Sequence, residues 1–166
     1  MLFNSIDELK DNGFKGFITI SELNNDPSCI PKEKGVYMVV FKGVRRPKFV
    51  EKGTGGFFKN RDPNKSLDYL KDRWVKNTIV LYIGKAGGEG TQETLNDRIK
   101  KYLSFGRGNK VSHKGGRLIW QIKSSSKLVV MCWKALLDEN PRIYEKELLT
   151  SFKELYGVLP FANLQL

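Results

Sequence analysis

The sequence predicts an α/β protein of the α+β type, in which helices flank a small, mostly antiparallel sheet of three strands. Two apolar, β-branched segments, residues 35–41 and 78–83, have the composition of buried strands. Residues 92–104 and 141–156 instead place their apolar side chains at helical spacing. The chain has 166 residues, which is the length of one domain with a sizeable core.

The first 34 residues are predicted to form a helical arm ahead of the main domain, residues 35–166. Two segments of this arm, Ser5-Ile-Asp-Glu8 and Thr19-Ile-Ser-Glu22, match the capping box. In that motif a hydroxyl and a carboxylate satisfy the first amide groups of a helix. We therefore expect short helices at about residues 5–11 and 19–25.

Residues 42–78, between the two strands, form an insertion that is polar, basic and rich in glycine, proline and asparagine. It is long for a plain connection, and residues 67–74 within it are predicted to be helical. Several glycines follow the second strand and predict a turn into the helix at 92–104. Gly106 can end that helix.

The C-terminal part is predicted to contain two strands, a helix and an extended tail. Residues 117–123 and 127–136 are the expected strands. The helix begins at Pro141, because proline is favoured in a first turn, and it ends before a glycine. Residues 160–166 form the tail.

Positive charge is concentrated in two segments of a chain whose net charge is +11. Residues 42–78 carry eleven lysines and arginines against four acids, and residues 98–137 carry ten and no acid. Aromatic residues lie between these cations, as stacking sites would. This pattern predicts a polyanion, most naturally nucleic acid, as the partner; a basic surface without a specific partner is the alternative. The candidate nucleic-acid-binding residues are Arg45, Arg46, Lys59, Arg61, Arg107, Lys110, Lys114 and Arg117.

Composition also bears on compartment and metal chemistry. The chain has no run of about 18 apolar residues, and its N-terminus lacks the pattern of a secretion signal. We therefore expect a cytoplasmic protein with no membrane partner. Cys29, Cys132 and the single histidine cannot form a four-ligand zinc site alone, and a disulfide is disfavoured in a reducing compartment.

Glu145 lies in the middle of the apolar side of its predicted helix, at roughly 100° per residue. Leu148, Leu149 and Phe152 fall on the same side, whereas Glu147 falls on the polar side. A carboxylate on a packed face is unfavourable unless a cation or several donors meet it. We therefore expect Glu145 to be held inward for a purpose and to meet a cation, such as a lysine or arginine, or several hydrogen-bond donors.

Five short motifs occur along the chain in a fixed order. They are Gly35-Val36-Tyr37, Tyr82-Ile83-Gly84-Lys85-Ala86, the pair Arg98 and Tyr102 on one helix, Glu145 in Glu-x-x-Leu-Leu, and Asn163 in Pro-x-x-Asn. Together they resemble the motifs of the GIY-YIG nucleases, and the resemblance covers residues 35–166. The chain differs from that family in the insertion, since the two tyrosine motifs of the family normally lie close together.

The resemblance implies hydrolysis of phosphodiester bonds with one divalent metal, Mg²⁺ or Mn²⁺, held by Glu145 in an oxygen shell. A single carboxylate implies weak metal binding until a phosphate arrives. Tyr37 would be the general base, and Lys85 would lower its pKa from about 10. Arg98 would bind the phosphate with its planar, permanently charged side chain.

Four further residues are candidates for the same site. Tyr82 and Tyr102 would position water or bind phosphate, or they would be ordinary core tyrosines. Asn163 is expected to support the site by hydrogen bonding to backbone or to Tyr37. His113, in the loop after the Arg98 helix, would assist proton transfer or bind phosphate, or it would simply be exposed.

The favoured interpretation is a metal-dependent DNA endonuclease. Two alternatives stay open: a nucleic-acid-binding module without catalysis, and a nuclease that acts on RNA or on single-stranded or branched DNA. The oligomeric state is open as well, since cutting both strands with one site requires either a homodimer or two successive nicks.

Overall fold

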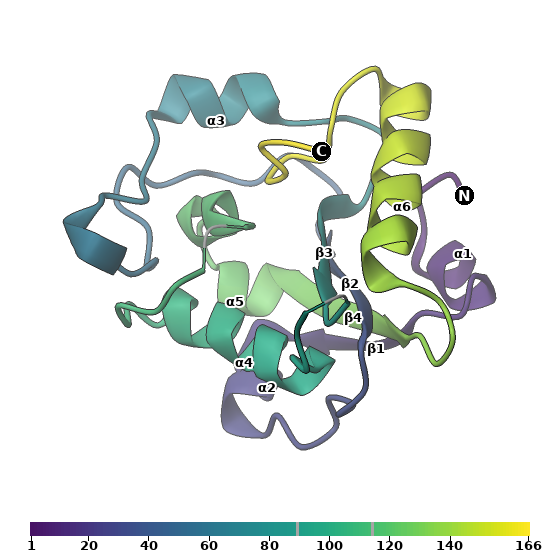
Figure 1. Cartoon of the computed structure of the whole chain (residues 1–166). Helices are drawn as coiled ribbons and strands as arrows, with labels where there is room; N and C mark the ends of the chain where they lie inside the picture. Colours follow the sequence, from purple (N-terminus) through teal and green to yellow (C-terminus); the bar gives the residue numbers. More distant parts are fainter. Residues whose placement is uncertain (89, 114) are drawn as a thin grey trace.

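The chain folds around a four-stranded antiparallel sheet with helices on both faces (Figure 1). The computed structural model describes residues 1–88, 90–113 and 115–166. In sheet order the strands are β1 (Lys15–Thr19), β4 (Val129–Ala135), β2 (Gly35–Phe41) and β3 (Val80–Ala86). Within those described ranges, no helix has the length and apolar character that crossing a bilayer requires.

Six α-helices and two 3₁₀ helices are found in the described part of the chain. The α-helices are α1 (Ile6–Asp11), α2 (Ile20–Asn25), α3 (Leu67–Arg73), α4 (Leu95–Gly106), α5 (Ser125–Leu128) and α6 (Pro141–Tyr156). The 3₁₀ helices are η1 (Phe58–Asn60) and η2 (Arg117–Gln121). The predicted helices at 5–11, 19–25, 67–74, 92–104 and 141–156 are therefore confirmed.

Two apolar clusters cover the two faces of the sheet. One contains Tyr37 and Val39 of β2 and the inward side chains of α4, among them Tyr102. The other contains Met38 of β2 and side chains of α6, such as Phe152. Since β2 lies between β4 and β3 and both its faces are covered, all seven of its residues are buried. This double burial explains its unbroken apolar sequence.

The prediction of three strands was wrong, because the N-terminal region contributes β1. That strand is short, and its regular pairing with β4 is interrupted between Gly16 and Ile18, where Phe17 adopts a positive φ. Such a bulge breaks the alternation that identifies a strand in sequence. The N-terminal region is therefore part of the sheet as well as helical.

The predicted strand at residues 117–123 was also wrong, since residues 117–121 form η2. Four consecutive residues, 118–121, are buried, whereas a strand with one covered face would bury alternate residues. Gly116 precedes the helix with a left-handed φ of 68°. Within the predicted strand, Ile122 forms an isolated antiparallel bridge with Phe49.

The C-terminal tail covers the outer edge of β3. The Ala162 amide donates to the Leu81 carbonyl at 2.8 Å. The Asn163 side chain accepts a hydrogen bond from the Ile83 amide at 2.9 Å and donates to the Ile83 carbonyl at 2.8 Å. An edge strand would otherwise present unpaired backbone groups, so the tail completes the sheet on both sides of Tyr82.

Candidate active site

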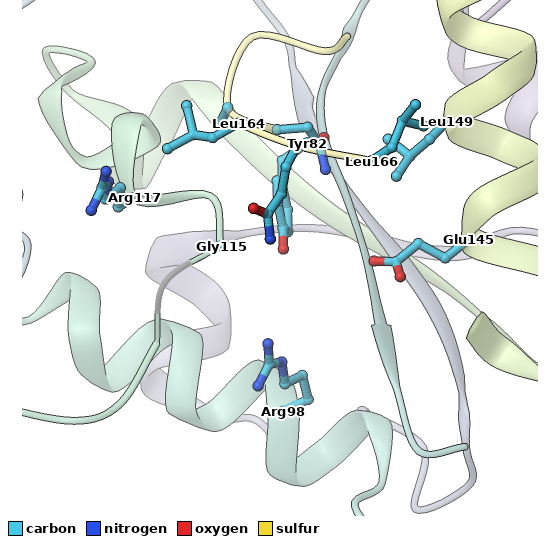
Figure 2. A pocket seen from close by; sticks show the side chains of 11 residues that line it. Tyr82, Arg98, Gly115, Arg117, Glu145, Leu149, Leu164 and Leu166 are labelled. Carbon is cyan, nitrogen blue, oxygen red and sulfur yellow. The ribbon is translucent and has the colours of Figure 1, made fainter. Parts of the chain in front are cut away.

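A cleft of about 420 Å³ lies between α4, the edge strand β3, α6 and the C-terminal tail. Tyr82 of β3, Arg98 of α4 and Glu145 of α6 line it, together with Arg117 and Asn163. Figure 2 shows the polar ends of the Tyr82, Arg98 and Glu145 side chains directed toward a common space. Three motifs far apart in sequence therefore meet in one cleft.

Three tyrosines form a cluster beneath this cleft. The Tyr37 ring lies 5.9 Å from the Tyr82 ring and 6.5 Å from the Tyr102 ring, between centroids. Tyr37 has no exposed surface, and its hydroxyl makes no well-formed hydrogen bond within the described residues, although the Arg98 and Tyr82 side chains lie near enough to lower its pKa. Burial raises the pKa of Tyr37 to about 12, although the nearby Arg98 opposes this shift. Of the three tyrosines, Tyr82 is the one that lines the cleft.

Two glycines allow the tyrosine cluster to close. A Cβ atom at Gly84 would lie 2.7 Å from Tyr37 Cζ and 2.8 Å from Tyr82 Cε1. A Cβ atom at Gly115 would lie 2.0 Å from the Tyr82 hydroxyl oxygen. Any side chain at these positions would displace a tyrosine, which gives the glycine of the Tyr-Ile-Gly motif a steric reason.

Arg98 is the cation beside Tyr37, a place that we predicted for Lys85. Burial lowers the pKa of Arg98, but the neighbouring Tyr37 and Glu93 act in the opposite sense and the net direction is upward. Its NH1 atom lies 3.8 Å from a Glu93 carboxylate oxygen, while its buried Nε has no partner in the described part of the chain. Successive side chains of a strand point to opposite faces of the sheet, so Lys85 does not lie on the face that carries Tyr82. It acts instead on Glu145.

Glu145 is a half-buried carboxylate that the surrounding cations do not fully compensate. Burial raises its pKa, and Lys85, Arg98 and Arg142 only partly oppose the shift. In the described ranges, no cation lies within ion-pair distance of it. Neither do the described residues bring together three acidic, histidine or cysteine side chains as a metal site. An under-compensated carboxylate on a cleft fits a divalent cation whose other ligands are water and phosphate oxygens.

Tyr102 and Asn163 support the site from behind. The Tyr102 hydroxyl donates to the Gly116 carbonyl at 3.2 Å, and its ring is fully buried. Burial raises the pKa of Tyr102 well above its usual range. Asn163 bonds to the backbone of Ile83, one of the two roles expected for it, and not to Tyr37.

His113 is buried, with 3% of its surface exposed, and it packs against the Tyr102 ring at 4.9 Å between centroids. It does not line the cleft that contains Tyr82. Burial lowers its pKa to about 3, with a further contribution from the positive charge of Arg98. The ring is therefore neutral at neutral pH, and His113 is not the exposed loop residue of the alternative prediction.

The candidate nucleic-acid-binding residues fall into separate groups. Lys59, Arg61 and Arg117 line a second cleft beside the first. Exposed side chains that line neither of these two clefts are those of Arg45, Arg46, Arg107 and Lys110. Arg107 donates to the Asn24 side chain at 2.5 Å, so it also joins α4 to α2. Lys114 lies outside the described residues.

Two functional supports were missed in the sequence. Arg73 of α3 donates to the Phe161 carbonyl at 2.9 Å and to the Asn163 carbonyl at 2.7 Å, and so holds the tail. Gln121 has 1% of its surface exposed and bonds to three carbonyls of the insertion. Arg73 and Gln121 belong to none of the recognised motifs. In the sequence, the one indication for Gln121 is that its polar side chain stands between apolar residues.

The fold and the cleft define an α+β protein with a tyrosine–arginine–glutamate site at the edge of its sheet. Comparisons of the chain with protein-family models, with curated proteins and with solved structures gave no match.

Proposed function

We propose that this protein is a metal-dependent endonuclease of the GIY-YIG type, which hydrolyses phosphodiester bonds of DNA. The convergence of Tyr82, Arg98 and Glu145 in one cleft carries this proposal (Figure 2). Phosphodiester hydrolysis needs a cation for the phosphate, a group that takes a proton from water, and a carboxylate for a metal. The cleft offers one side chain of each kind.

In this proposal Arg98 binds the phosphate that is attacked. Its side chain is 29% exposed and lines the cleft. The contact of Arg98 with Glu93 is long, at 3.8 Å. A phosphate can replace it, because charge-assisted hydrogen bonds from a guanidinium are shorter and often bidentate. The same guanidinium stabilises negative charge that develops on the phosphate oxygens.

Tyr37 is proposed to act as general base through Tyr82, because water in the cleft meets Tyr82 first. A water proton passes to the Tyr82 oxygen while the Tyr82 proton passes to the ionised Tyr37 oxygen. The water oxygen forms a bond to phosphorus, the bond from phosphorus to the leaving sugar oxygen breaks, and that oxygen takes a proton from solvent. Since burial raises the pKa of Tyr37 to about 12, its ionisation requires added positive charge.

Glu145 is the residue that would hold this added charge. A bound divalent metal supplies positive charge that stabilises the leaving oxygen and favours the ionised tyrosine. Glu145 lies across the cleft from Arg98 (Figure 2), so the phosphate would be held between a cation on α4 and a carboxylate-bound cation on α6.

Cleavage of supercoiled plasmid DNA with Mg²⁺ tests the proposal, with Glu145→Gln compared against Glu147→Gln. Glu147 is exposed and lies two residues after Glu145 on the opposite side of α6, so it is a matched control. We expect Glu145→Gln to cut at least about a hundredfold more slowly, since a catalytic metal contributes several kcal/mol. Its affinity for DNA without metal should be unchanged.

Equal cleavage by wild type and Glu145→Gln would reject the metal site. Linear duplex, single-stranded DNA, branched DNA and RNA, offered beside the plasmid, would define the substrate. A wild-type protein that binds these nucleic acids and cuts none of them would instead be a binding module, and the proposed nuclease would be rejected.

A further inference from the structure

A second cleft, of about 330 Å³, lies between the insertion and the segment that leads into η2. Lys59 and Arg61 of the insertion line one side, and His113 and Arg117 line the other. Arg117 also lines the first cleft, so the two clefts share one side chain. Figure 2 shows Arg117 and Glu145 on opposite sides of Tyr82. A strand bound in the first cleft could therefore continue past Arg117 into the second.

The second cleft contains buried polar atoms without partners. His113 is 3% exposed, and neither of its ring nitrogens makes a well-formed hydrogen bond to a residue that the structure describes, although the nearby Gly115 backbone acts to raise its pKa. The buried Nε of Arg117 is equally unpaired within the described ranges. Such atoms are rare in folded proteins. A neutral imidazole offers one N–H donor and one acceptor, and an arginine Nε offers a donor.

The charge of this cleft favours an anion. Lys59 and Arg61 are exposed cations at its rim. The acidic Asp62 also lines it, but its Oδ1 accepts hydrogen bonds from the Asn64 amide at 2.8 Å and from Asn64 Nδ2 at 2.7 Å. These hydrogen bonds hold the carboxylate in the turn of the insertion but leave its charge in place. Three cations, Lys59, Arg61 and Arg117, therefore stand against one acid, and the net charge of the lining residues is positive. Phe58, half-buried in the same wall, offers an aromatic ring.

The insertion is held in a defined place beside η2. The Gln121 side-chain amide donates to the carbonyls of Val50, Glu51 and Lys65 at 3.0, 3.1 and 2.8 Å. Its oxygen accepts from the Lys65 amide at 2.7 Å. One buried side chain therefore ties both ends of residues 50–65 to η2. The cations of the insertion are positioned before any ligand binds, which lowers the entropy cost of binding.

We propose that the second cleft binds the nucleotide next to the cleaved phosphodiester, on the same strand. Arg117 and Arg61 hold its phosphate, His113 donates an N–H to it, and the base stacks on Phe58. The place of this subsite in the reaction rests on the proposed nuclease function, whereas the binding itself requires no catalysis. The insertion thereby extends the substrate contact beyond the site of hydrolysis.

Binding of a fluorescein-labelled DNA duplex, without divalent metal and over a series of salt concentrations, tests this subsite. Arg61→Ala is compared with Lys10→Ala, an exposed cation on α1, which lies on the opposite side of the molecule from η1 and the adjoining Arg61 (Figure 1). We expect Arg61→Ala to bind about tenfold more weakly and to lower the slope of log affinity against log salt by about one. Lys10→Ala should leave that slope unchanged.

His113→Phe is the second variant, since it keeps an aromatic ring against Tyr102 but removes both nitrogens. We expect it to weaken DNA binding about fivefold, the loss of one hydrogen bond, with no fall in melting temperature. If His113→Phe does not fold, Arg61→Ala decides alone.

Equal salt slopes for Arg61→Ala and Lys10→Ala would refute the subsite, even in a protein that cuts DNA efficiently. A selective loss in Arg61→Ala, in a protein that cuts no DNA, would retain the subsite and reject the nuclease. The two proposals can therefore fail separately.

Discussion

Asn163→Ala should destabilise the protein strongly, because Asn163 satisfies both backbone groups of Ile83. Its side chain accepts from the Ile83 amide at 2.9 Å and donates to the Ile83 carbonyl at 2.8 Å, and it is 6% exposed. A buried backbone group left unpaired costs about 1–3 kcal/mol. Two such groups give a loss of roughly 2–6 kcal/mol. For a domain of this size the melting temperature should fall by about 4–24 °C.

Urea unfolding followed by far-ultraviolet circular dichroism measures this loss. Gln165→Ala is the control, because Gln165 is an exposed residue of the same tail, and its stability should match the wild type. Asn163→Asp keeps the acceptor for the Ile83 amide but places a carboxylate oxygen against the Ile83 carbonyl, so it should be at least as unstable as Asn163→Ala. A free energy of unfolding for Asn163→Ala within about 0.5 kcal/mol of the wild type would refute this account of the tail.

Two further predictions concern buried polar groups of the site. Burial lowers the pKa of His113 to about 3, so the unfolded chain gains a proton below about pH 6.5 that the folded protein does not. The free energy of unfolding should therefore fall as the pH decreases below about 6.5, by up to about 1.4 kcal/mol per pH unit. Urea titrations at several pH values measure this fall, and His113→Phe should lose less stability than the wild type over the same range. An equal pH dependence in the two proteins would contradict the prediction. Tyr37→Phe removes a buried hydroxyl that has no partner among the described residues, so its melting temperature should stay the same or rise while plasmid cleavage is lost; retained cleavage would show that Tyr37 is not the base.

Local sequence patterns predicted the strands β2, β3 and β4 and every described α-helix except α5. The capping residues act within one turn: Thr19 accepts from the Glu22 amide at 3.2 Å, and Glu22 bonds back to the Thr19 amide at 2.9 Å. The apolar side of α6 likewise placed Glu145 toward the core rather than toward solvent. Both features depend on neighbours three or four residues away, which the sequence displays directly.

The elements that were missed depend on distant parts of the chain. β1 is a strand because β4 lies beside it, with paired residues 111 to 118 positions apart in sequence, and its bulge hides the alternation. η2 buries consecutive residues because the insertion covers it through Gln121. The cation beside Tyr37 was assigned to Lys85 because both lie in neighbouring motifs. The direction of the Lys85 side chain instead follows from its register opposite Val36, which only the folded sheet reveals.

The unpaired buried polar atoms are concentrated around the two clefts. In the described part of the chain they belong to Tyr37, Arg98, His113 and Arg117, and to Trp120, which lines neither cleft but packs against the Tyr102 ring. The nitrogens of arginine and tryptophan can only donate hydrogen bonds, and each tyrosine hydroxyl and neutral histidine ring can donate one. A ligand that satisfied them would have to be rich in acceptors and, because two of the donors are guanidinium groups, negatively charged. A chain of phosphates that passes from Arg98 to Arg117 has both properties, and it accounts for polar groups that the fold alone leaves without partners.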